Sequence, residues 1–167
     1  MDDPILVTFC DASESAFGAC CYLRLQTTSS SFEVQLMASK SRVSPTKVQS
    51  IVRLEICGAV LGKRLAQFIE SETRFKIKKR YFIVDSEVVR SMIQKQSHGF
   101  NTFVAVRIGE IQEFTDPKEW YWVESEANIA DWISRGKKAC EIDEESDWQV
   151  GPKFLRDEEN KWPINFF

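Results

Sequence analysis

The chain has 167 residues and a formal net charge of -3, with a sequence pI of about 5.4, and its length suggests a single domain of ordinary size. This acidic balance provides no overall field that would attract nucleic acid, so any such binding must use local basic patches. Hydrophobic residues make up 43% of the chain, enough for a core. No apolar run approaches the roughly 20 residues that cross a bilayer, and the acidic start lacks the pattern of a signal peptide, so we expect no membrane association.

Five cysteines and a single histidine argue against a zinc site. The cysteines form no CxxC pair and His98 is the only histidine, so the usual ligand spacings are missing. The odd number of cysteines and their placement in apolar runs predict reduced, packed thiols, as in cytosolic or nuclear proteins. The cysteines are Cys10, Cys20, Cys21, Cys57 and Cys140.

Three strand patterns open the chain. The segment "ILVTFCD" (5–11) predicts a buried strand that ends in a carboxylate, and the turn "ASESAFG" follows it. Segments 19–26 and 32–40 predict two further strands, which the Ser/Thr-rich turn 27–31 joins. We therefore expect the chain to begin with an antiparallel meander.

Helices and strands alternate in the rest of the chain. The run 51–69 predicts a helix capped by Ser50, and the short apolar segment 80–85 predicts a central strand covered on both faces. The later predicted elements are helices over 86–96 and 101–114, a strand over 119–124 and a short helix over 128–136 that Gly136 closes.

This order of elements predicts an α/β fold, a mixed sheet with helices on its faces. We assign residues 1–136 to the domain and predict that residues 137–167 form a C-terminal tail packed on it. The anchors of the tail would be Trp148, Phe154, Leu155 and Trp162. Trp120, Trp122 and Trp132 are predicted to be core residues rather than base-stacking surfaces.

Glu55 is the misfit in the predicted helix 51–69. A helix rotates by about 100° per residue, so Ile51, Gly58, Ala59 and Gly62 share the face of Glu55. A lone buried carboxylate is costly unless a cation compensates it, and residues two positions apart on a helix point apart, which excludes Arg53. The small residues would let the helix lie close to a strand and bring Glu55 toward Asp11. The alternative is a solvated position on the helix surface.

Three aspartates end or begin other elements, and each has a purely structural alternative. Asp11 could start an Asx-turn, Asp85 could be a helix N-cap, and Asp131 could belong to a capping box with Asn128. If strands 5–11 and 80–85 are parallel neighbours, however, Asp11 and Asp85 emerge side by side at their carboxyl ends, where sites in open α/β sheets gather. Asp131 could then close the cluster.

Four clustered carboxylates repel one another and need a cation. Hard oxygen ligands select Mg²⁺ or Mn²⁺. Two such ions about 4 Å apart would suit in-line displacement at a phosphodiester.

At these residues the chain resembles the ribonuclease H domain of BEL/Pao-type LTR retrotransposon polyproteins. The resemblance spans roughly residues 9 to 155, and its most specific motifs are "RLE", "DSE" and "NIADWISRG" in this order, with "FVAVRIGEIQE" between the last two. Further matching segments are "CDASESAFGACCYLR", "MASKSRVSP" and "DWQVGPKFL".

The resemblance implies a ribonuclease H-like fold, with a five-stranded mixed sheet flanked by helices. It implies endonucleolytic cleavage of the RNA strand of RNA–DNA hybrids with two Mg²⁺ ions, for which Mn²⁺ can substitute, leaving 5′-phosphate and 3′-hydroxyl ends. Asp11 would bridge both ions, Glu55 and Asp85 would hold the ion on the leaving-group side, and Asp131 would help to hold the ion that activates water. A reverse transcriptase domain is expected upstream in the same polyprotein, in a cytoplasmic retroelement particle or in the nucleus.

One departure concerns a histidine that many relatives have in the loop before the last aspartate. Here that loop is "VESEAN", and His98 lies far back in the sequence, where a solvated loop position is the alternative. The departure puts the turnover rate in question rather than the chemistry.

Candidate substrate contacts flank the acidic residues. Ser13, Glu14 and Ser15 follow Asp11 and could contact 2′-hydroxyls, with ordinary turn polarity as the alternative. The basic run 74–80 is expected at the opposite end of the sheet, because nine extended residues span about 30 Å. The predicted phosphate contacts are Lys40, Arg42, Lys47, Arg53, Arg135, Lys137 and Lys138.

Two other functions remain open at this point. A domesticated, non-catalytic module could keep the fold to bind hybrid nucleic acid or a protein partner. An exonuclease or an integrase-like strand transferase could use the same scaffold, although the three-strand meander and the fourth acidic residue favour ribonuclease H.

Overall fold

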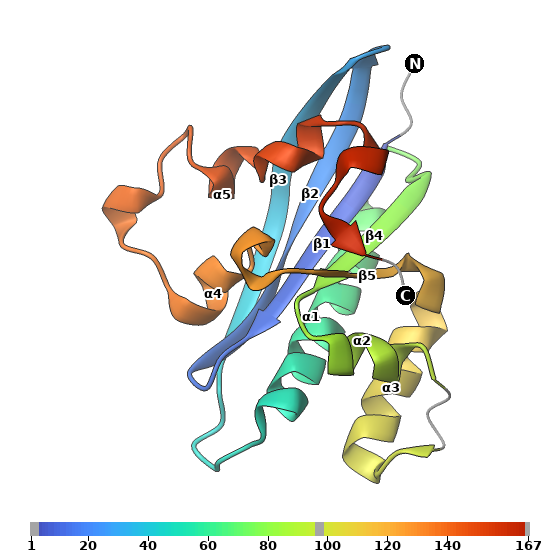
Figure 1. The fold of residues 1–167 in the computed structure, drawn as a ribbon, viewed down its shortest axis with the longest axis vertical. Coiled ribbons are helices and arrows are strands. Elements are labelled where there is room, and N and C mark those ends of the chain that lie inside the picture. The colour runs from blue at the N-terminus through green and yellow to red at the C-terminus, as the bar shows by residue number, and fades with distance from the viewer. Residues whose placement is uncertain (1–3, 96–98, 166–167) are drawn as a thin grey trace.

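A computed structural model of the protein describes residues 4–95 and 99–165. Six strands form one mixed sheet in the order β3-β2-β1-β4-β5-β6 (Figure 1). The strands are β1 (Ile5–Ala12), β2 (Ala16–Thr28), β3 (Ser31–Val43), β4 (Lys79–Val84), β5 (Trp120–Val123) and β6 (Ile164–Asn165).

The first three strands form the predicted antiparallel meander. β2 and β3 each continue beyond the predicted limits 19–26 and 32–40 at both ends. From Ser31 to Ser39 exposed and half-buried residues alternate along β3, as expected for an edge strand that has one face against the core, and the rest of the strand is exposed. The ladder hydrogen bonds of the long hairpin therefore extend these strands past the apolar segments that predicted them.

β4 lies parallel to β1 and to β5, so the central part of the sheet is parallel. β1 is buried along its whole length, because its alternate residues face different core clusters. Leu6 and Cys10 belong to the cluster under the helices, whereas Val7 and Phe9 belong to the cluster under the C-terminal tail. This double burial explains the continuous apolar sequence of the strand.

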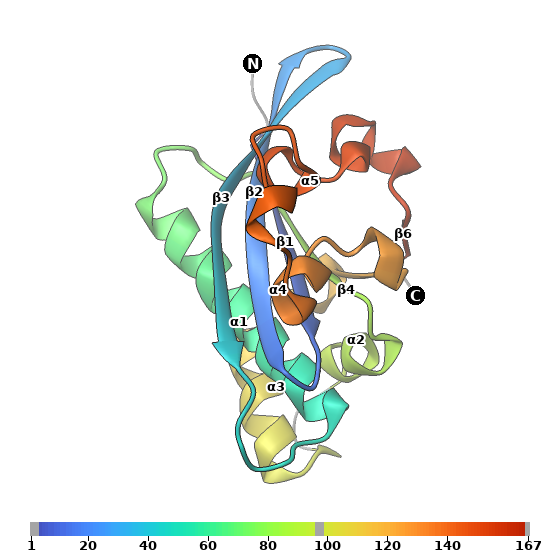
Figure 2. The same cartoon turned by 90° about the vertical axis from the view of Figure 1, so that its left-hand side faces the viewer.

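Three helices cover one face of the sheet, and the tail segments lie on the other (Figure 2). The long helix α1 (Ile51–Glu72) begins as predicted at Ser50, whose hydroxyl accepts a hydrogen bond from the Arg53 amide at 3.3 Å. α2 (Glu87–Ile93) and α3 (Thr102–Phe114) pack against it. The predicted helix over 86–96 is wrong at its end, because α2 stops at Ile93 and Gln94 caps it.

The short helices α4 (Asp131–Arg135) and α5 (Asp147–Val150) accompany the tail. Leu155 and Trp162 are buried, and Trp148 and Phe154 pack against the same cluster. β6 pairs antiparallel with β5, so the prediction of five strands is wrong by one. Two residues near the chain end add this sixth strand through backbone pairing, which leaves no apolar pattern to detect.

Two groups of side-chain predictions need correction. Trp120 is fully buried, but Trp122 and Trp132 are only half-buried. All five cysteines are free, and Cys140 is exposed rather than packed. His98 lies outside the described residues. In the part of the chain that the structure describes, no helix has both the length and the apolar character to span a membrane.

Candidate active site

The carboxyl ends of β1 and β4 place two acidic residues at one edge of the sheet. β1 and β4 are parallel neighbours; Asp11 lies at the end of β1 and Asp85 directly follows β4. Both line a pocket of about 710 Å³, together with Glu55 and Asp131. The structure thus brings all four predicted acidic residues to one concavity.

The structural alternatives for Asp11 and Asp85 are wrong. The N-cap of α2 is Ser86, whose hydroxyl accepts a hydrogen bond from the Val89 amide at 3.2 Å. Asp11 belongs to β1, and Ser13 forms the turn contacts instead. Other residues therefore supply the cap of α2 and the turn after β1, and neither aspartate has that structural role.

Two glycines let α1 lie close to β1, as predicted. A Cβ atom added at Gly58 would lie 2.9 Å from the backbone oxygen of Asp11, and one at Gly62 would lie 2.3 Å from the Cys10 Sγ atom. Larger side chains would therefore push the helix away from the strand. Glu55 lies one turn before Gly58 on this helix and is half-buried at the pocket.

Burial and mutual repulsion raise the pKa values of the three central carboxyl groups. Burial raises the pKa of Asp11 to about 7, with a further contribution from the charge of Asp85. Burial also raises the pKa of Asp85, against hydrogen bonds from neighbouring groups. The pKa of Glu55 is raised by burial, although Ser86 opposes the shift through a hydrogen bond. Negative charge is thus held here at an energetic cost.

Three polar residues that sequence reasoning missed support the acidic cluster. The Ser134 hydroxyl donates a hydrogen bond of 2.5 Å to Asp11 Oδ2. The Asn128 Nδ2 donates to the Cys10 carbonyl at 2.9 Å, and Trp122 Nε1 donates to the Asp85 carbonyl at 3.1 Å. The only signal for Ser134 was its spacing of three residues from Asp131, which places both on one side of α4.

Asp131 differs from the other three acids because it has a cationic partner. Arg135 Nε lies 2.7 Å from Asp131 Oδ1, one helical turn away. Asp131 is the first residue of α4, and Asn128 Oδ1 accepts from the Ala130 amide instead. The capping-box alternative therefore does not describe this helix start.

Several predicted substrate residues lie at the rim of the same pocket. Ser13, Glu14, Ser15 and Arg135 line it. Glu14 and Ser15 are exposed. The Ser13 hydroxyl instead donates a 2.6 Å hydrogen bond to the Ser134 carbonyl, which ties the turn after β1 to α4.

The other predicted phosphate contacts do not line this pocket. Lys40 and Lys47 are exposed on β3 and on the loop that follows it. Arg42 lines a second cavity between β3 and the helices, and Arg53 stacks over the Phe103 ring at 4.8 Å. Lys137 and Lys138 are exposed beyond α4, with Lys137 over the Trp132 ring at 4.7 Å.

The donor set fits a hard divalent cation in its chemistry. Carboxylate oxygens are the ligands that Mg²⁺ and Mn²⁺ prefer. Within residues 4–95 and 99–165, no ion pair joins Asp11, Glu55 or Asp85 to a Lys or Arg side chain. In the same residues, no three acidic, thiol or imidazole side chains converge closely enough to hold an ion as they stand. A cation bound by three of them would therefore need these side chains to move closer together.

The first part of the chain matches a known protein family. The family model described as "Pao retrotransposon-like RNaseH-like domain" matches residues 1–86. This match covers β1 to β4 and three of the four acidic residues. A search of curated proteins found no match.

Solved structures with a similar fold have low sequence identity. The N-terminal RNase H domain of rv2228c from Mycobacterium tuberculosis, solved as a fusion with maltose-binding protein, is 15% identical, with a TM-score of 0.48, over 78% of this chain and 91% of that chain. RNase H1 from Halobacterium salinarum NRC-1 is 12% identical, with a TM-score of 0.42, over 75% and 88%. The NurA nuclease from Sulfolobus solfataricus is 8% identical, with a TM-score of 0.34, over 90% and 50%.

Proposed function

Because the chain belongs to the Pao retrotransposon-like RNaseH-like domain family, we propose that it is a metal-dependent endonuclease that cleaves the RNA strand of RNA–DNA hybrids. One observation carries this proposal. Three carboxyl groups from β1, α1 and the end of β4 line one pocket, with raised pKa values and, among the residues that the structure describes, no ion pair with a Lys or Arg side chain. A bound cation would offset the repulsion and the desolvation cost of these buried carboxylates, and so would stabilise the folded protein.

Each acidic residue has a distinct proposed role. Asp11, the most buried of them, would contribute oxygens to both of two Mg²⁺ ions. Glu55 and Asp85 would hold the ion on the leaving-group side, and Asp131 would help to hold the other. Two ions of this kind supply the positive charge that in-line displacement at a phosphodiester requires, and Mn²⁺ can replace Mg²⁺. The products would carry 5′-phosphate and 3′-hydroxyl ends.

The rim of the pocket would select the RNA strand. Glu14 and Ser15 are exposed beside Asp11, where they could contact the 2′-hydroxyls that distinguish RNA from DNA. The Ser13 hydroxyl, which donates to Ser134, would position this turn. Arg135 would exchange its partner Asp131 for a phosphate, and so free that carboxylate for a cation.

Cleavage of an end-labelled RNA–DNA hybrid in Mg²⁺ tests the proposal directly. We expect cuts within the RNA strand, and no cuts in single-stranded RNA or in a DNA duplex of the same sequence. Asp85→Asn should abolish cutting while the protein stays folded, and the exposed Glu126→Gln serves as a matched loss of charge. Full activity of Asp85→Asn, or chain-end dependence of cutting, would contradict the proposal.

A second candidate is a non-catalytic domain that binds hybrids or a protein partner. It is favoured by the ion pair between Arg135 and Asp131, which neutralises one of the four acids. Firm hybrid binding without cleavage in either Mg²⁺ or Mn²⁺ would support it. In both cases we propose that the domain works beside a reverse transcriptase domain upstream in the same polyprotein, in a cytoplasmic particle or in the nucleus.

A further inference from the structure

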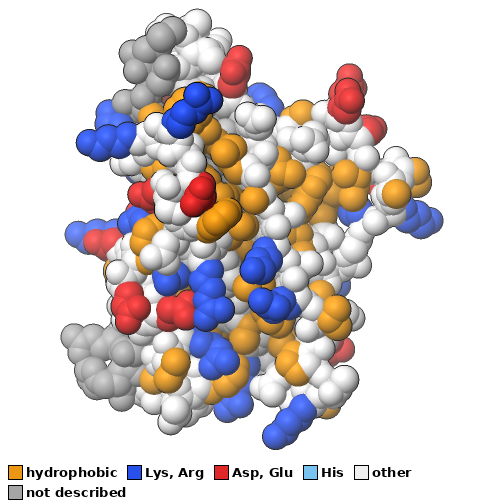
Figure 3. Space-filling model, turned by 180° about the vertical axis from the view of Figure 1, so that it is seen from behind, with side chains coloured by type: hydrophobic (Ala, Val, Ile, Leu, Met, Phe, Trp, Pro, Cys, Tyr) orange, Lys and Arg blue, Asp and Glu red, His pale blue; other side chains and the backbone are white. Residues whose placement is uncertain are grey.

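A surface rich in cations lies at the end of the sheet opposite the acidic pocket, where α1 leads into β4. It combines exposed Lys and Arg side chains with exposed aromatic rings. Seen from behind, Lys and Arg side chains lie beside apolar ones at the upper left of the molecule (Figure 3). The residues of this surface, which we call the basic corner, are Phe68, Arg74, Phe75, Lys76 and Lys78.

Only part of the basic run 74–80 has an ion-pair partner within the fold. Lys79 and Arg80 form ion pairs of 2.9 and 2.8 Å with glutamates of the tail and of the segment before β5. In the described part of the chain, neither Arg74 nor Lys76 forms a side-chain hydrogen bond or ion pair. Positive charge therefore faces solvent at the basic corner, in a chain whose formal net charge is -3.

Two phenylalanine rings are exposed at the basic corner. Phe68 is 62% exposed and Phe75 is 44% exposed, and they are the only aromatic residues among the exposed large hydrophobic side chains of the described residues. The Phe68 carbonyl accepts a hydrogen bond of 2.7 Å from the Ser71 hydroxyl, and the Phe75 amide donates one of 3.3 Å to Thr73 Oγ1. Local hydrogen bonds thus hold the backbone that carries both rings.

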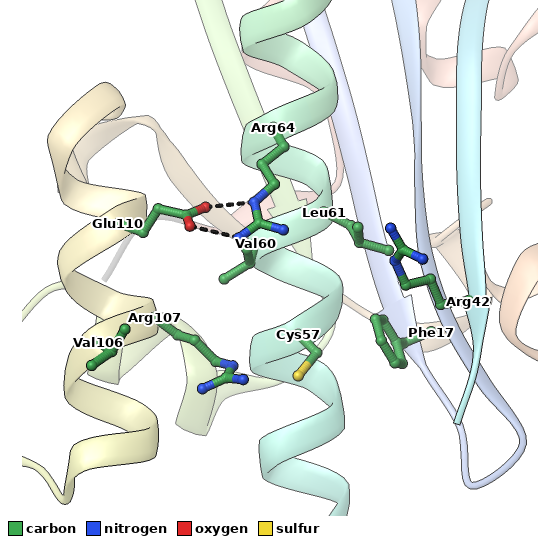
Figure 4. Close-up of a pocket in the computed structure, with 9 residues that line it drawn as sticks. All are labelled: Phe17, Arg42, Cys57, Val60, Leu61, Arg64, Val106, Arg107 and Glu110. Carbon is green, nitrogen blue, oxygen red and sulfur yellow. Dashed lines mark hydrogen bonds and ion pairs between the residues drawn. The ribbon is translucent and has the colours of Figure 1, made fainter. Parts of the chain in front are cut away.

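The basic corner is separate from the cavity between β3, α1 and α3. Figure 4 shows that cavity, with Arg64 of α1 bound to Glu110 of α3. Two hydrogen bonds of 2.9 and 2.7 Å join these side chains, so the charge of Arg64 is compensated. Phe68 lies about one helical turn further along α1 and does not line the cavity. The basic corner is therefore a second concentration of positive charge.

Exposed aromatic rings between cations suit single-stranded nucleic acid. Bases stack on the faces of aromatic side chains with little regard to sequence, and Lys and Arg side chains bind the phosphates. A duplex keeps its bases stacked on one another, and freeing a base face costs energy. Phe68 and Phe75 therefore favour a single strand over a continuation of the duplex.

Two lengths along the chain place the basic corner about 20 Å from the acidic pocket. Phe68 follows Glu55 by 13 residues on α1, about 20 Å at a rise of about 1.5 Å per residue. Lys79 at the start of β4 precedes Asp85 by six residues, also about 20 Å at about 3.3 Å per residue. The basic run 74–80 thus lies at the opposite end of the sheet, as predicted. At about 3.4 Å per nucleotide, 20 Å corresponds to about six nucleotides.

We propose that the basic corner binds a single-stranded extension of the hybrid that the acidic pocket cleaves. This proposal rests on the proposed function, because it extends the substrate of that site from a duplex to a duplex with an unpaired end. The basic corner would raise the affinity for such substrates without taking part in the chemistry. An acidic protein segment and an anionic membrane surface are the competing partners.

The first test compares binding of the full chain to a blunt hybrid and to hybrids that carry a single-stranded extension of about ten nucleotides on one end. We expect one of the extensions to tighten binding about five- to tenfold. Phe68→Ala and Phe75→Ala should each reduce this gain to about twofold or less. Phe75→Leu should do the same, because it keeps an apolar side chain but loses the ring. Binding and cleavage of the blunt hybrid should be unchanged in all three variants.

The salt dependence of binding tests the cations of the basic corner. Arg74→Ala and Lys76→Ala should each lower the slope of log K against log salt by about 0.7 for the extended hybrid, the scale of one phosphate contact on a single strand. The slope for the blunt hybrid should not change. Lys153→Ala and Ile142→Ala, which alter exposed side chains of the tail, are the matched controls. An unchanged thermal midpoint confirms that each variant folds.

The outcomes separate this proposal from the proposed function. If wild type cleaves the blunt hybrid but no extension tightens binding, or no variant of the basic corner reduces the gain, the inference is overturned and the proposed function stands. It is also overturned if Phe75→Ala abolishes binding to polyglutamate or to phosphatidylserine vesicles but leaves the gain intact. Absence of cleavage in Mg²⁺ and in Mn²⁺, with a gain that depends on Phe75, would support the basic corner and contradict the proposed function alone.

Discussion

Carboxylates are held in opposite ways at the two ends of the sheet. At one end, Asp11, Glu55 and Asp85 share a pocket in which they form no ion pair with a described Lys or Arg side chain, and burial raises their pKa values. At the other end, burial would raise the pKa of Glu159, but hydrogen bonds from Tyr81 and Lys79 lower it below its usual range. The fold can thus compensate a carboxylate where the contact is structural. At the acidic pocket, no Lys or Arg side chain among the described residues forms an ion pair with Asp11, Glu55 or Asp85.

The Glu159 contacts also explain how the tail is attached. Arg24 is buried between the Phe32 and Trp162 rings, 3.5 and 5.1 Å from their centroids. It donates to the carbonyls of Leu155 and Asp157 at 2.6 and 2.7 Å. Arg24 alone therefore donates to two backbone carbonyl groups of the tail, and its guanidinium also lies 3.8 Å from the Glu159 carboxylate.

The largest effect should come from removing charge at the acidic pocket. Asp85→Asn should lower the cleavage rate by at least about 100- to 1000-fold, the usual scale for losing one electrostatic contact in a transition state. Its thermal midpoint should not fall, because the lost charge is an uncompensated one. Quantified cleavage of a labelled hybrid and a thermal scan together measure both. If Asp85→Asn lost stability along with activity, the claim that the Asp85 charge has no stabilising partner in the fold would be contradicted.

The opposite outcome is expected at the tail. Arg24→Ala should lower the free energy of unfolding by about 3 kcal/mol, because it leaves the carbonyl groups of Leu155 and Asp157 without their donor and removes a buried side chain that packs between two rings. Denaturant unfolding measures this change, with the exposed Lys153→Ala as a control of equal charge loss. The cleavage rate of the folded fraction should stay close to that of wild type. A change below about 1 kcal/mol would show that the tail does not depend on this contact.

Stability should respond to pH through Asp11. Its folded pKa of about 7 is raised above the usual range, so the protonated form stabilises the fold at low pH, and this contribution is lost as pH rises through about 7. Without divalent ions, wild type should therefore lose stability between pH 5 and pH 8, relative to Asp11→Asn. The variant should be more stable at pH 8 by about 1–3 kcal/mol. Parallel unfolding curves at both pH values would contradict this sign.

The smallest effect concerns Ser134, whose hydrogen bond lowers the pKa of Asp11. In Ser134→Ala this support is gone, so the acidic limb of the pH–rate profile should move to higher pH by about half a unit to one unit. The plateau rate at high pH should change little. Ser39→Ala, at an exposed position outside the pocket, is the matched control, and an identical shift in both variants would deny Ser134 its particular role.

Much of the fold and part of the site could be predicted from the sequence. The antiparallel meander, the Ser50 cap and the ribonuclease H-like mixed sheet are confirmed, since they depend on local patterning and on a motif order that is specific. Glu55 was detectable because a charged residue interrupted an apolar helix face beside small residues. The gathering of Asp11, Glu55 and Asp85 followed from strand ends and helix packing.

The features that could not be predicted depend on contacts between distant segments. β6 has two residues and pairs through its backbone, and Arg24 reaches a tail more than 130 positions away. The pairing of Asp131 with Arg135, and the stacking of Arg107 on Phe103, are choices between rotamers that one sequence does not specify. Such contacts determine which charged side chains have a partner, and so they determine how the two ends of the sheet differ.

Calorimetric titration of the metal-free protein with Mg²⁺ or Mn²⁺ at pH 7, in buffers of different ionisation enthalpy, tests the central claim most directly. We predict saturable binding to wild type with release of about half a proton, because ion binding requires Asp11 in its charged form. Asp11→Asn should release fewer protons than wild type, and Asp85→Asn should bind far more weakly. Absence of binding at millimolar concentrations, or equal binding by wild type and Asp85→Asn, would contradict the account.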